Sequence, residues 1–216
     1  MLFRSIRIDL ATIEQAHAAE QTALLEIERL NQVFSTYSPE SELSQLNRLE
    51  IGQSQVVSAD LHRLLTESID WQHKTRSAFH PGAESLCELW KAAAKRNELP
   101  TDAELARVVS SLASPAWEWE SNLSVRKSTA YRVGLNAIAE GYILDRVFEL
   151  LSTRFRPQSL LINLGGEVRC GGKSAQVAIR NPRATATNAK PLLELALDGE
   201  AVATSGGYHQ IGRAHV

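Results

Sequence analysis

Apolar residues along the first half of the chain recur three or four positions apart, the spacing of one face of an α-helix. The longest such stretch runs from Thr12 to Phe34, and the segment after it contains Pro39, which keeps the preceding residue out of helical geometry. The apolar face of this predicted helix consists of Ile13, Ala16, Ala23, Ile27, Leu30 and Phe34. Shorter stretches predict a short helical or turn segment over 41–47 and helices over 58–76, 84–95 and 101–113.

Two of these helices carry N-terminal capping signals. Ser58 is a suitable N-cap, because its side chain can accept a hydrogen bond from the first turn. The buried face of that helix is predicted to hold Leu61, Leu64, Leu65 and Ser68. Thr101 and Glu104 have the spacing of a capping box. The Pro-Gly pair in the segment 77–82 predicts a loop.

The second half of the chain shows the alternation of apolar and polar positions that is typical of β-strands. A hairpin is predicted around Ser121-Asn122, and then a helix over 136–155 with Ile138, Val147, Leu150 and Leu151 inward. Strands are predicted over 3–8, 160–164, 167–170, 176–180, 192–197 and 200–203. Gly165-Gly166 ends the second of these strands, Gly171-Gly172 joins the third and fourth as a hairpin, and Asp198-Gly199 makes the last turn. N-terminal helices followed by antiparallel β-hairpins predict an α+β fold, with a surface loop over 181–190.

Composition excludes several classes of protein. The 216 residues are enough for one domain with a substantial core. Lys and Arg number 23 against 25 Asp and Glu, and a net charge of -2 argues against a nucleic-acid binder. No apolar run approaches the ~20 residues of a membrane span, so no transmembrane segment is expected. Cys87 and Cys170 fit no metal or redox spacing and are expected to be buried thiols.

Three short regions combine polar groups with small residues. Residues 35–47 form a polar loop with an aromatic, and 135–142 begin a helix with small residues, where a ligand can approach the backbone and an anion is favoured. Residues 163–167 and 204–207 end strands in glycines and polar groups. Taken singly, a turn, a helix cap and a strand terminator explain them equally well.

Five blocks in order make the pattern more specific. They are Phe34 to Asn47 with Tyr37 and Ser41, Ser77-Ala78-Phe79-His80-Pro81 with Leu86 to Trp90, Gly134 to Asp145, Asn163 to Glu167 followed by Pro182, and Ala203 to Gly206. In this arrangement the chain resembles the ApbE family, the FAD:protein FMN transferases, from about residue 30 to residue 208. The resemblance implies a single ApbE-like, T-fold-like α+β domain over residues 1–210, incomplete at its C-terminus.

The resemblance implies a flavin-binding role for the first two blocks. Tyr37 matches the tyrosine that packs against the flavin, although a loop aromatic that caps the core is an alternative. Ala78, Phe79 and His80 match a three-residue stretch that contacts FAD. Ser77 stands where the family has glycine.

The later blocks imply a metal ligand and further cofactor contacts. Ala137 matches the residue whose backbone carbonyl helps to hold Mg²⁺. Thr204 and Ser205 match a strand-end loop beside the flavin pocket, although simple turn residues are an alternative.

Three cofactor-binding positions depart from the family pattern. His80 replaces an Asp, Gly134 replaces an Asp that contacts FAD, and Glu140 replaces a Lys that contacts FAD. A lysine offers charge-assisted hydrogen bonds, whereas Glu140 would repel a diphosphate. These changes lower the expected affinity for FAD. No general base is assigned, and His80 is a candidate only because imidazole titrates near neutrality.

The two ends of the chain raise separate expectations. Residues 211–216 are expected to be a sequencing-adapter artefact. The family's His-x-Ile-Asp-Pro and Asp-x-x-x-Thr blocks do not occur here, so the chain as given is expected to be inactive. The resemblance implies a periplasmic or inner-membrane-associated protein, although no signal peptide is recognisable at the start.

The activity implied is Mg²⁺-dependent transfer of FMN from FAD to a threonine side chain of a target flavoprotein, with release of AMP. FAD and Mg²⁺ are the expected cofactors, and the target flavoprotein is the expected partner. An FAD pyrophosphatase, in which water replaces the threonine, remains an alternative. A flavin-binding protein without turnover and a structural α+β domain are two others.

Overall fold

The computed structural model describes residues 4–121, 123–184 and 189–205. The chain divides into two compact units, one formed by residues 1–27 and 140–216 and the other by residues 28–139. It passes from one unit to the other inside helix α1 (Ile13–Phe34) and inside helix α6 (Asn136–Phe155). The domain extent of 1–210 stays a prediction, and residues 211–216 lie outside the described part of the chain.

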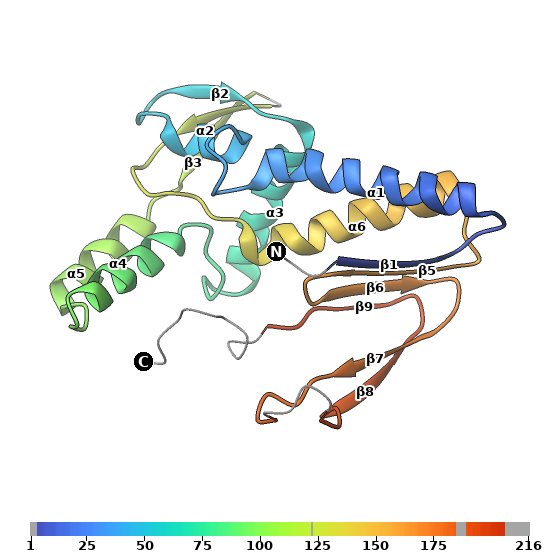
Figure 1. Ribbon diagram of the computed structural model, residues 1–216. Helices are drawn as coiled ribbons and strands as arrows, with labels where there is room; N and C mark the ends of the chain where they lie inside the picture. The colour runs from blue at the N-terminus through green and yellow to red at the C-terminus, as the bar shows by residue number, and fades with distance from the viewer. Residues whose placement is uncertain (1–3, 122, 185–188, 206–216) are drawn as a thin grey trace. The chain divides into compact units, whose positions relative to one another are not determined.

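A four-stranded antiparallel sheet forms the centre of the first unit, in the order β1-β5-β6-β9 (Figure 1). Its strands are β1 (Arg4–Asp9), β5 (Ser159–Leu164), β6 (Glu167–Gly171) and β9 (Ala201–Val202). β1 confirms the strand predicted at the start of the chain, and the structure pairs it with β5 along its whole length. Gly165 and Gly166 join β5 to β6 with positive φ angles of 76° and 131°, which confirms the predicted strand stop.

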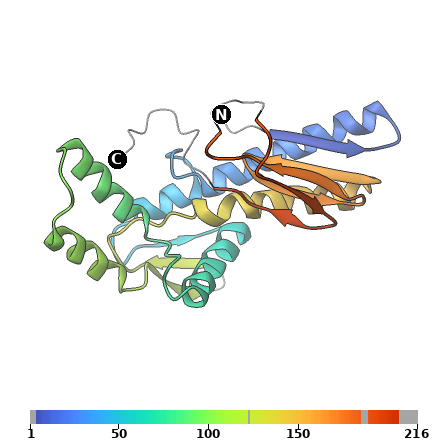
Figure 2. The ribbon, with the colours of Figure 1, turned by 90° about the horizontal axis from the view of Figure 1, so that it is seen from below.

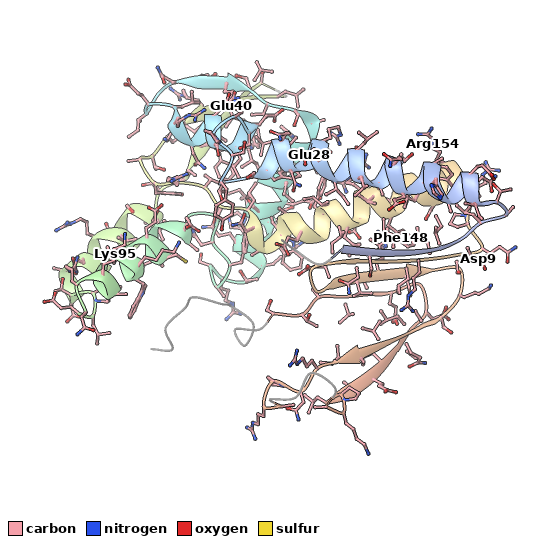
Figure 3. The ribbon with its side chains drawn as sticks, viewed as in Figure 1. Asp9, Glu28, Glu40, Lys95, Phe148 and Arg154 are labelled. Carbon is pink, nitrogen blue, oxygen red and sulfur yellow. The ribbon has the colours of Figure 1, made fainter. Side chains whose placement is uncertain are left out.

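One face of this sheet lies against α6, which runs beside the strands in Figure 2. Successive strand residues point to opposite faces, so Glu167, Arg169 and Gly171 of β6 share this face. Asp145 of α6 accepts a hydrogen bond from Arg169 at 2.6 Å. Phe148 of α6, labelled in Figure 3, lies 4.4 Å below the Arg169 guanidinium. A Cβ at Gly171 would come within 2.6 Å of the same ring, so the close packing of this helix requires glycine there.

The opposite face lies against a hairpin of β7 (Ala175–Ile179) and β8 (Leu193–Leu197). Val168 and Cys170 of β6 form a buried cluster there with Leu197. The predicted hairpin between 167–170 and 176–180 is therefore wrong. β6 is paired with β5 on one edge and β9 on the other, which leaves no edge for β7. The bend at Asp198-Gly199 is present, but it leads from β8 into a strand of the other sheet.

The second unit contains a three-stranded antiparallel sheet in the order β2-β4-β3. Its strands are β2 (Ser54–Val56), β3 (Trp117–Ser121) and β4 (Ser124–Lys127), and the β3–β4 hairpin confirms the prediction. The prediction missed β2, a strand of three residues with no buried position. The helices of this unit are α2 (Glu42–Arg48), α3 (Ala59–Lys74), α4 (Glu84–Lys95) and α5 (Asp102–Leu112). Its most deeply buried side chains include Leu30, Leu43, Leu61, Leu64, Leu65 and Val125.

The predicted helices and caps are confirmed, with differences in burial. The Ser58 side chain accepts from the Leu61 N–H at 3.2 Å, and Thr101 with Glu104 forms the complete capping box. Ile13 is wrong as a core residue, because it begins α1 and is 74% exposed. Cys170 is buried, but Cys87 is exposed on α4, a helix in which only Ala93 is buried. Val147 and Leu151 are buried on α6, whereas Ile138 and Leu150 are half-buried.

The arrangement confirms the α+β class, with antiparallel sheets throughout the described residues. Within those residues, no helix combines the length and the apolar character needed to cross a membrane.

Candidate functional site

A strained turn at the end of α3 leads into the loop that contains Ala78, Phe79 and His80. Arg76 and Ser77 adopt φ angles of 52° and 64°, in the left-handed region that favours glycine. The Ser77 N–H bonds the Gln72 carbonyl at 2.8 Å, which closes the helix end. This geometry explains why the family pattern has a glycine at the position of Ser77.

The Thr75 side chain links this helix end to the loop. Its hydroxyl donates to the Trp71 carbonyl at 2.7 Å and accepts the Phe79 N–H at 3.0 Å. The Thr75 carbonyl accepts the Ala78 N–H at 3.1 Å. Ala78 is exposed and Phe79 is half-buried, so these bonds hold the backbone of the loop while part of it stays accessible. The sequence prediction missed Thr75, because a threonine after a helix carries no signal of its own.

His80 fixes the other end of the loop and uses both ring nitrogens to do so. Nδ1 accepts the Gly82 N–H at 2.9 Å, and Nε2 lies 3.1 Å from the Leu112 carbonyl. A carbonyl can only accept, so the arrangement requires a neutral ring with its proton on Nε2. Partial burial lowers the pKa of His80 below 6.5, against a smaller opposing effect of the Leu112 carbonyl. This ring is a structural link, and neither nitrogen is left to act as a general base.

Gly134 lies beside the same loop. Its N–H bonds the Pro81 carbonyl at 2.7 Å, and a Cβ built at Gly134 would lie 3.5 Å from the Glu84 Cβ at the start of α4. A Cβ at Gly82 would come within 2.5 Å of Leu112, so this glycine allows the loop to pack closely. The structure therefore brings Ala78, Phe79 and His80 together with Gly134.

The first sequence block forms a hydrogen-bonded loop in the same unit. The Ser41 hydroxyl donates to the Ser35 carbonyl at 2.5 Å and caps α2 through the Ser44 N–H. Tyr37 projects from this loop and is 89% exposed. This exposure rules out the alternative in which Tyr37 caps the core, and it leaves a whole aromatic face available to a partner.

Asn47, at the end of that block, ties it to the segment before Gly134. Its side chain donates to the Val133 carbonyl at 2.9 Å and accepts the Val133 N–H at 2.7 Å. The buried Lys127 ammonium donates to the carbonyls of Asn47 and Leu49 at 2.6 and 2.7 Å. Burial lowers the pKa of Lys127, and the nearby Arg132 lowers it further. Sequence reasoning did not assign these links, which join segments 78 or more residues apart.

Ala137 lies in the first turn of α6 and is exposed. A helix carbonyl keeps a second lone pair, so its oxygen can take part in metal binding. Mg²⁺ requires about six oxygen ligands in octahedral geometry. Within the described ranges, no group of three or more His, Cys, Asp or Glu residues could hold a metal ion. The described residues therefore contain no acidic or histidine cluster around the Ala137 carbonyl, and a single main-chain ligand does not by itself fit Mg²⁺.

Glu140 and Glu167 form a carboxyl pair in the first unit. Burial, followed by the hydrogen bond and the charge of Glu167, raises the pKa of Glu140 from 4.5 to about 7. The Glu167 Oε2 atom is buried and has no hydrogen-bond partner among the described residues. A hydrogen bond between two carboxyl groups requires a proton on one of them, so Glu140 keeps its proton up to about pH 7 while it is bonded to Glu167. Sequence reasoning singled out Glu140 but missed its partner on β6.

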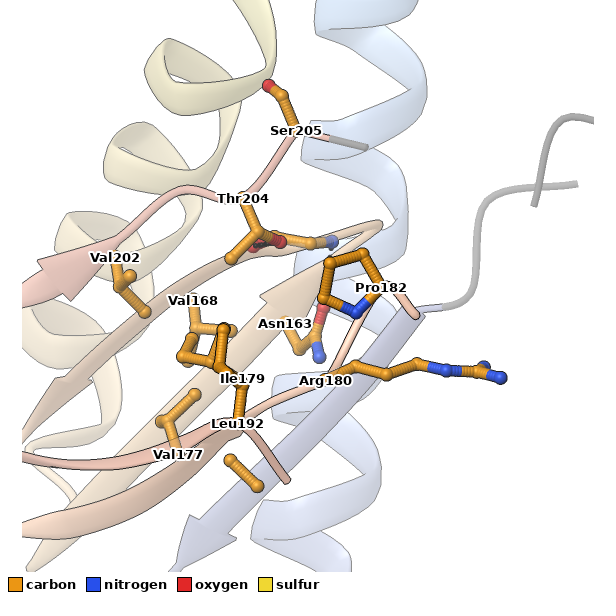
Figure 4. A pocket seen from close by; sticks show the side chains of 12 residues that line it. Asn163, Val168, Val177, Ile179, Arg180, Pro182, Leu192, Val202, Thr204 and Ser205 are labelled. Atoms are coloured by element: carbon orange, nitrogen blue, oxygen red, sulfur yellow. Dashed lines mark hydrogen bonds between the residues drawn. The ribbon is translucent and has the colours of Figure 1, made fainter. Parts of the chain in front are cut away.

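Thr204 lies beside the glycine turn of β5 and β6. Its hydroxyl donates to the Gly166 carbonyl at 3.2 Å, and Asn163 accepts the Gly166 N–H at 3.2 Å. Both residues line a cavity of about 650 Å³ that also borders Ser205. Its walls are mostly apolar, from Val168, Val177, Val202, Ile179 and Leu192, with Thr204 and Ser205 toward one end (Figure 4). An apolar cavity with a few polar groups at its edge is typical of a small-molecule site.

The predicted site residues fall into two groups. Tyr37, the 78–80 loop, Gly134 and Ala137 belong to the second unit, whereas Glu140, Thr204 and Ser205 belong to the first. In the second unit, hydrogen bonds connect the block ending at Asn47 and the 78–80 loop to residues 133–134, and in the first unit Thr204 and Ser205 line one cavity.

The sequence model of the ApbE family matches residues 4–214 of this chain. The chain belongs to the ApbE family. Curated relatives include the FAD:protein FMN transferases of Haemophilus influenzae, at 28% identity over 92% of this chain, and of Treponema pallidum, at 26% over 91%. The chain spans 59% of the length of each of these two relatives.

Solved structures of the ApbE family share the fold. The apo flavinyl transferase of Pseudomonas stutzeri matches with a TM-score of 0.76 at 21% identity, over 96% of this chain and 66% of that one. An ApbE protein from Thermotoga maritima matches with a TM-score of 0.77 at 22% identity, over 96% and 71% of the two chains. These likenesses confirm the ApbE-like α+β fold.

Proposed function

We propose that this protein transfers FMN from FAD to a threonine side chain of a target flavoprotein, in a Mg²⁺-dependent reaction that releases AMP. The family match over residues 4–214, with curated relatives described as FAD:protein FMN transferases, carries this proposal. The geometry of each unit supports it: the second unit holds the exposed Tyr37 and the hydrogen-bonded 78–80 loop, and the first holds the cavity at Thr204.

In this reaction the threonine oxygen attacks the FMN-side phosphorus of FAD. A phosphorus–oxygen bond to threonine forms, the phosphorus–oxygen bond to AMP breaks, and the hydroxyl proton is released. Phosphoryl transfer depends mainly on positioning and electrostatic stabilisation, which the protein supplies through fixed loops. Tyr37 and the 78–80 loop orient the flavin. His80 does not take the threonine proton, because its Nδ1 accepts the Gly82 N–H and its Nε2–H donates to the Leu112 carbonyl.

The Mg²⁺ requirement rests on the family resemblance. When bound, such an ion neutralises the diphosphate and the charge of the leaving group. The resemblance assigns it the Ala137 carbonyl, and no cluster of three or more His, Cys, Asp or Glu residues exists in the described ranges, so we assign the ion no step.

Glu140 favours a second candidate, a flavin-binding protein without turnover. Ionised Glu140 would repel a diphosphate where a lysine would attract it, and its pairing with Glu167 places further negative charge nearby. An FAD pyrophosphatase would use the same pocket with water as the nucleophile. We also propose, from the family, that the protein acts at the periplasmic side of the inner membrane.

The test is incubation of the chain with FAD, Mg²⁺ and a flavoprotein that carries an acceptor threonine, with mass spectrometry of the target. A mass increase of FMN less one water, absent from the threonine-to-alanine target, supports transfer and overturns the expected inactivity of the chain. Steady release of FMN and AMP without a target supports the pyrophosphatase. Retained FAD without products supports the binding protein. Failure to bind FAD contradicts all three.

A further inference from the structure

The loop that presents Ala78 and Phe79 is anchored at both ends by side chains. At its start, the Thr75 hydroxyl accepts the Phe79 N–H at 3.0 Å while it donates to the Trp71 carbonyl at 2.7 Å. At its end, His80 accepts the Gly82 N–H at 2.9 Å. Each anchor holds the backbone, so the exposed side of the loop remains free for a ligand.

The anchor at Thr75 fixes a backbone that is otherwise unfavourable. Arg76 and Ser77, the two residues after it, both have positive φ angles of 52° and 64°. Non-glycine residues in this region persist only where the surrounding structure holds them. Thr75 supplies part of that hold, because its hydroxyl and its carbonyl bond the amides of Phe79 and Ala78, the two residues that follow the strained pair.

We infer that Thr75 is a positioning residue for FAD, which acts by setting the backbone of Ala78 and Phe79. This inference rests on the proposed function, because it takes the 78–80 loop as the flavin contact. This role requires no contact between Thr75 and the cofactor. Its hydroxyl accepts the Phe79 N–H, which has no helical carbonyl to bond because α3 has ended. Removal of the hydroxyl leaves that N–H without this partner and lets the loop move.

Helix α3 offers a matched control for the test. The Thr66 hydroxyl donates to the His62 carbonyl at 2.9 Å, four residues earlier, as the Thr75 hydroxyl does to Trp71. Thr66 is exposed and its hydroxyl has no bond to the loop in the described residues. The substitutions Thr75→Val and Thr66→Val therefore remove the same kind of helix bond, and only the first removes the bond to Phe79.

The experiment measures FAD affinity by flavin fluorescence and amide hydrogen exchange at Phe79 for the wild type, Thr75→Val, Thr75→Ser and Thr66→Val. Loss of one hydrogen bond to a partly buried amide weakens the affinity roughly tenfold. We expect Thr75→Val to weaken FAD binding by about this factor and to speed Phe79 exchange. Thr75→Ser restores the hydroxyl and behaves like the wild type, as does Thr66→Val.

Several outcomes overturn the inference. One is wild-type FAD affinity in Thr75→Val, whether or not exchange at Phe79 is faster. Another is an equal loss of affinity in Thr75→Val and Thr66→Val, which indicates a general effect on α3. If Thr75→Val fails to fold, Thr75→Ala against Thr66→Ala makes the same comparison. A wild-type chain that binds no FAD refutes the proposed function and the positioning role with it, while the exchange data still show separately whether the anchor exists.

Discussion

Ser77 has a backbone conformation that costs energy for any residue with a Cβ. Its φ of 64° lies in the left-handed region, where glycine is free of the steric penalty. We expect Ser77→Gly to raise the free energy of unfolding by about 1 kcal/mol. Ser77→Ala keeps the penalty and should stay within about 0.5 kcal/mol of the wild type. Urea unfolding of the three proteins measures the difference, and a less stable Ser77→Gly would show that the serine is not strained.

Glu140 gives the stability of the chain a distinctive pH dependence. Its pKa is raised to about 7 in the fold from 4.5, so the folded state holds this proton more tightly than the unfolded state does. The resulting stability is fully present below pH 4.5 and is lost as the pH rises through about 7. Glu140→Gln removes this loss, so the variant should exceed the wild type at pH 8 by on the order of 1 kcal/mol, after allowance for solvent screening.

Thermal unfolding from pH 5 to pH 8 measures this dependence. Glu149→Gln is a suitable control, because Glu149 is an exposed carboxyl on the same helix with only a surface ion pair to Arg146. The control should follow the wild-type profile. Equal profiles for wild type and Glu140→Gln would mean that the carboxyl pair does not share a proton.

At the scale of elements, the turn between β6 and β7 depends on a single glycine. Gly172 has a φ of 85°, and a Cβ there would lie 2.2 Å from the Gln158 carbonyl oxygen, a backbone atom. Gly199 has a φ of 73° with nothing within 4 Å of its Cβ position, so Gly199→Ala measures the conformational penalty alone. We expect Gly172→Ala to cost on the order of 3 kcal/mol and Gly199→Ala about 1 kcal/mol. Equal costs would contradict the close approach to the segment before β5.

The loop after α3 should loosen in acid through His80. Its pKa is lowered from 6.5, so its contribution to stability is present above pH 6.5 and is lost as the pH falls through the lowered value. Protonated Nδ1 cannot accept the Gly82 N–H. Exchange at the Gly82 amide, corrected for its intrinsic rate, should accelerate below that pKa. His80→Asn, which accepts a hydrogen bond without titrating there, should show no such step.

The sequence predicted elements better than it predicted their pairing. Capping residues such as Ser58 and Thr101 act within one turn, so their signals are local and all of them are confirmed. The strand that pairs with the second edge of β6 lies 30 or more positions away in the sequence. The Gly171-Gly172 turn predicts β7 at that edge, but β9 occupies it. The same limit applies to the site. Glu140 could be singled out by its type, whereas Glu167 and Thr75 gain their roles only from contacts in the fold.

At the scale of the whole molecule, a ligand that binds only the folded chain must raise its unfolding temperature. A ligand at a concentration one hundred times its dissociation constant raises the free energy of unfolding by about 2.7 kcal/mol. We expect FAD to raise the unfolding temperature of the wild type at pH 6 more than at pH 8, because Glu140 becomes charged between them.

Glu140→Lys places an ammonium opposite Glu167 and restores the family's charge toward the diphosphate. Its FAD response should therefore exceed that of the wild type and vary less between the two pH values. Riboflavin, which has no phosphate, separates flavin packing from charge, since its response should be the same in both proteins. A Glu140→Lys chain that responds to FAD no better than the wild type at pH 8 would show that position 140 does not face the diphosphate, and the repulsion argument for a non-catalytic protein would then fail as well.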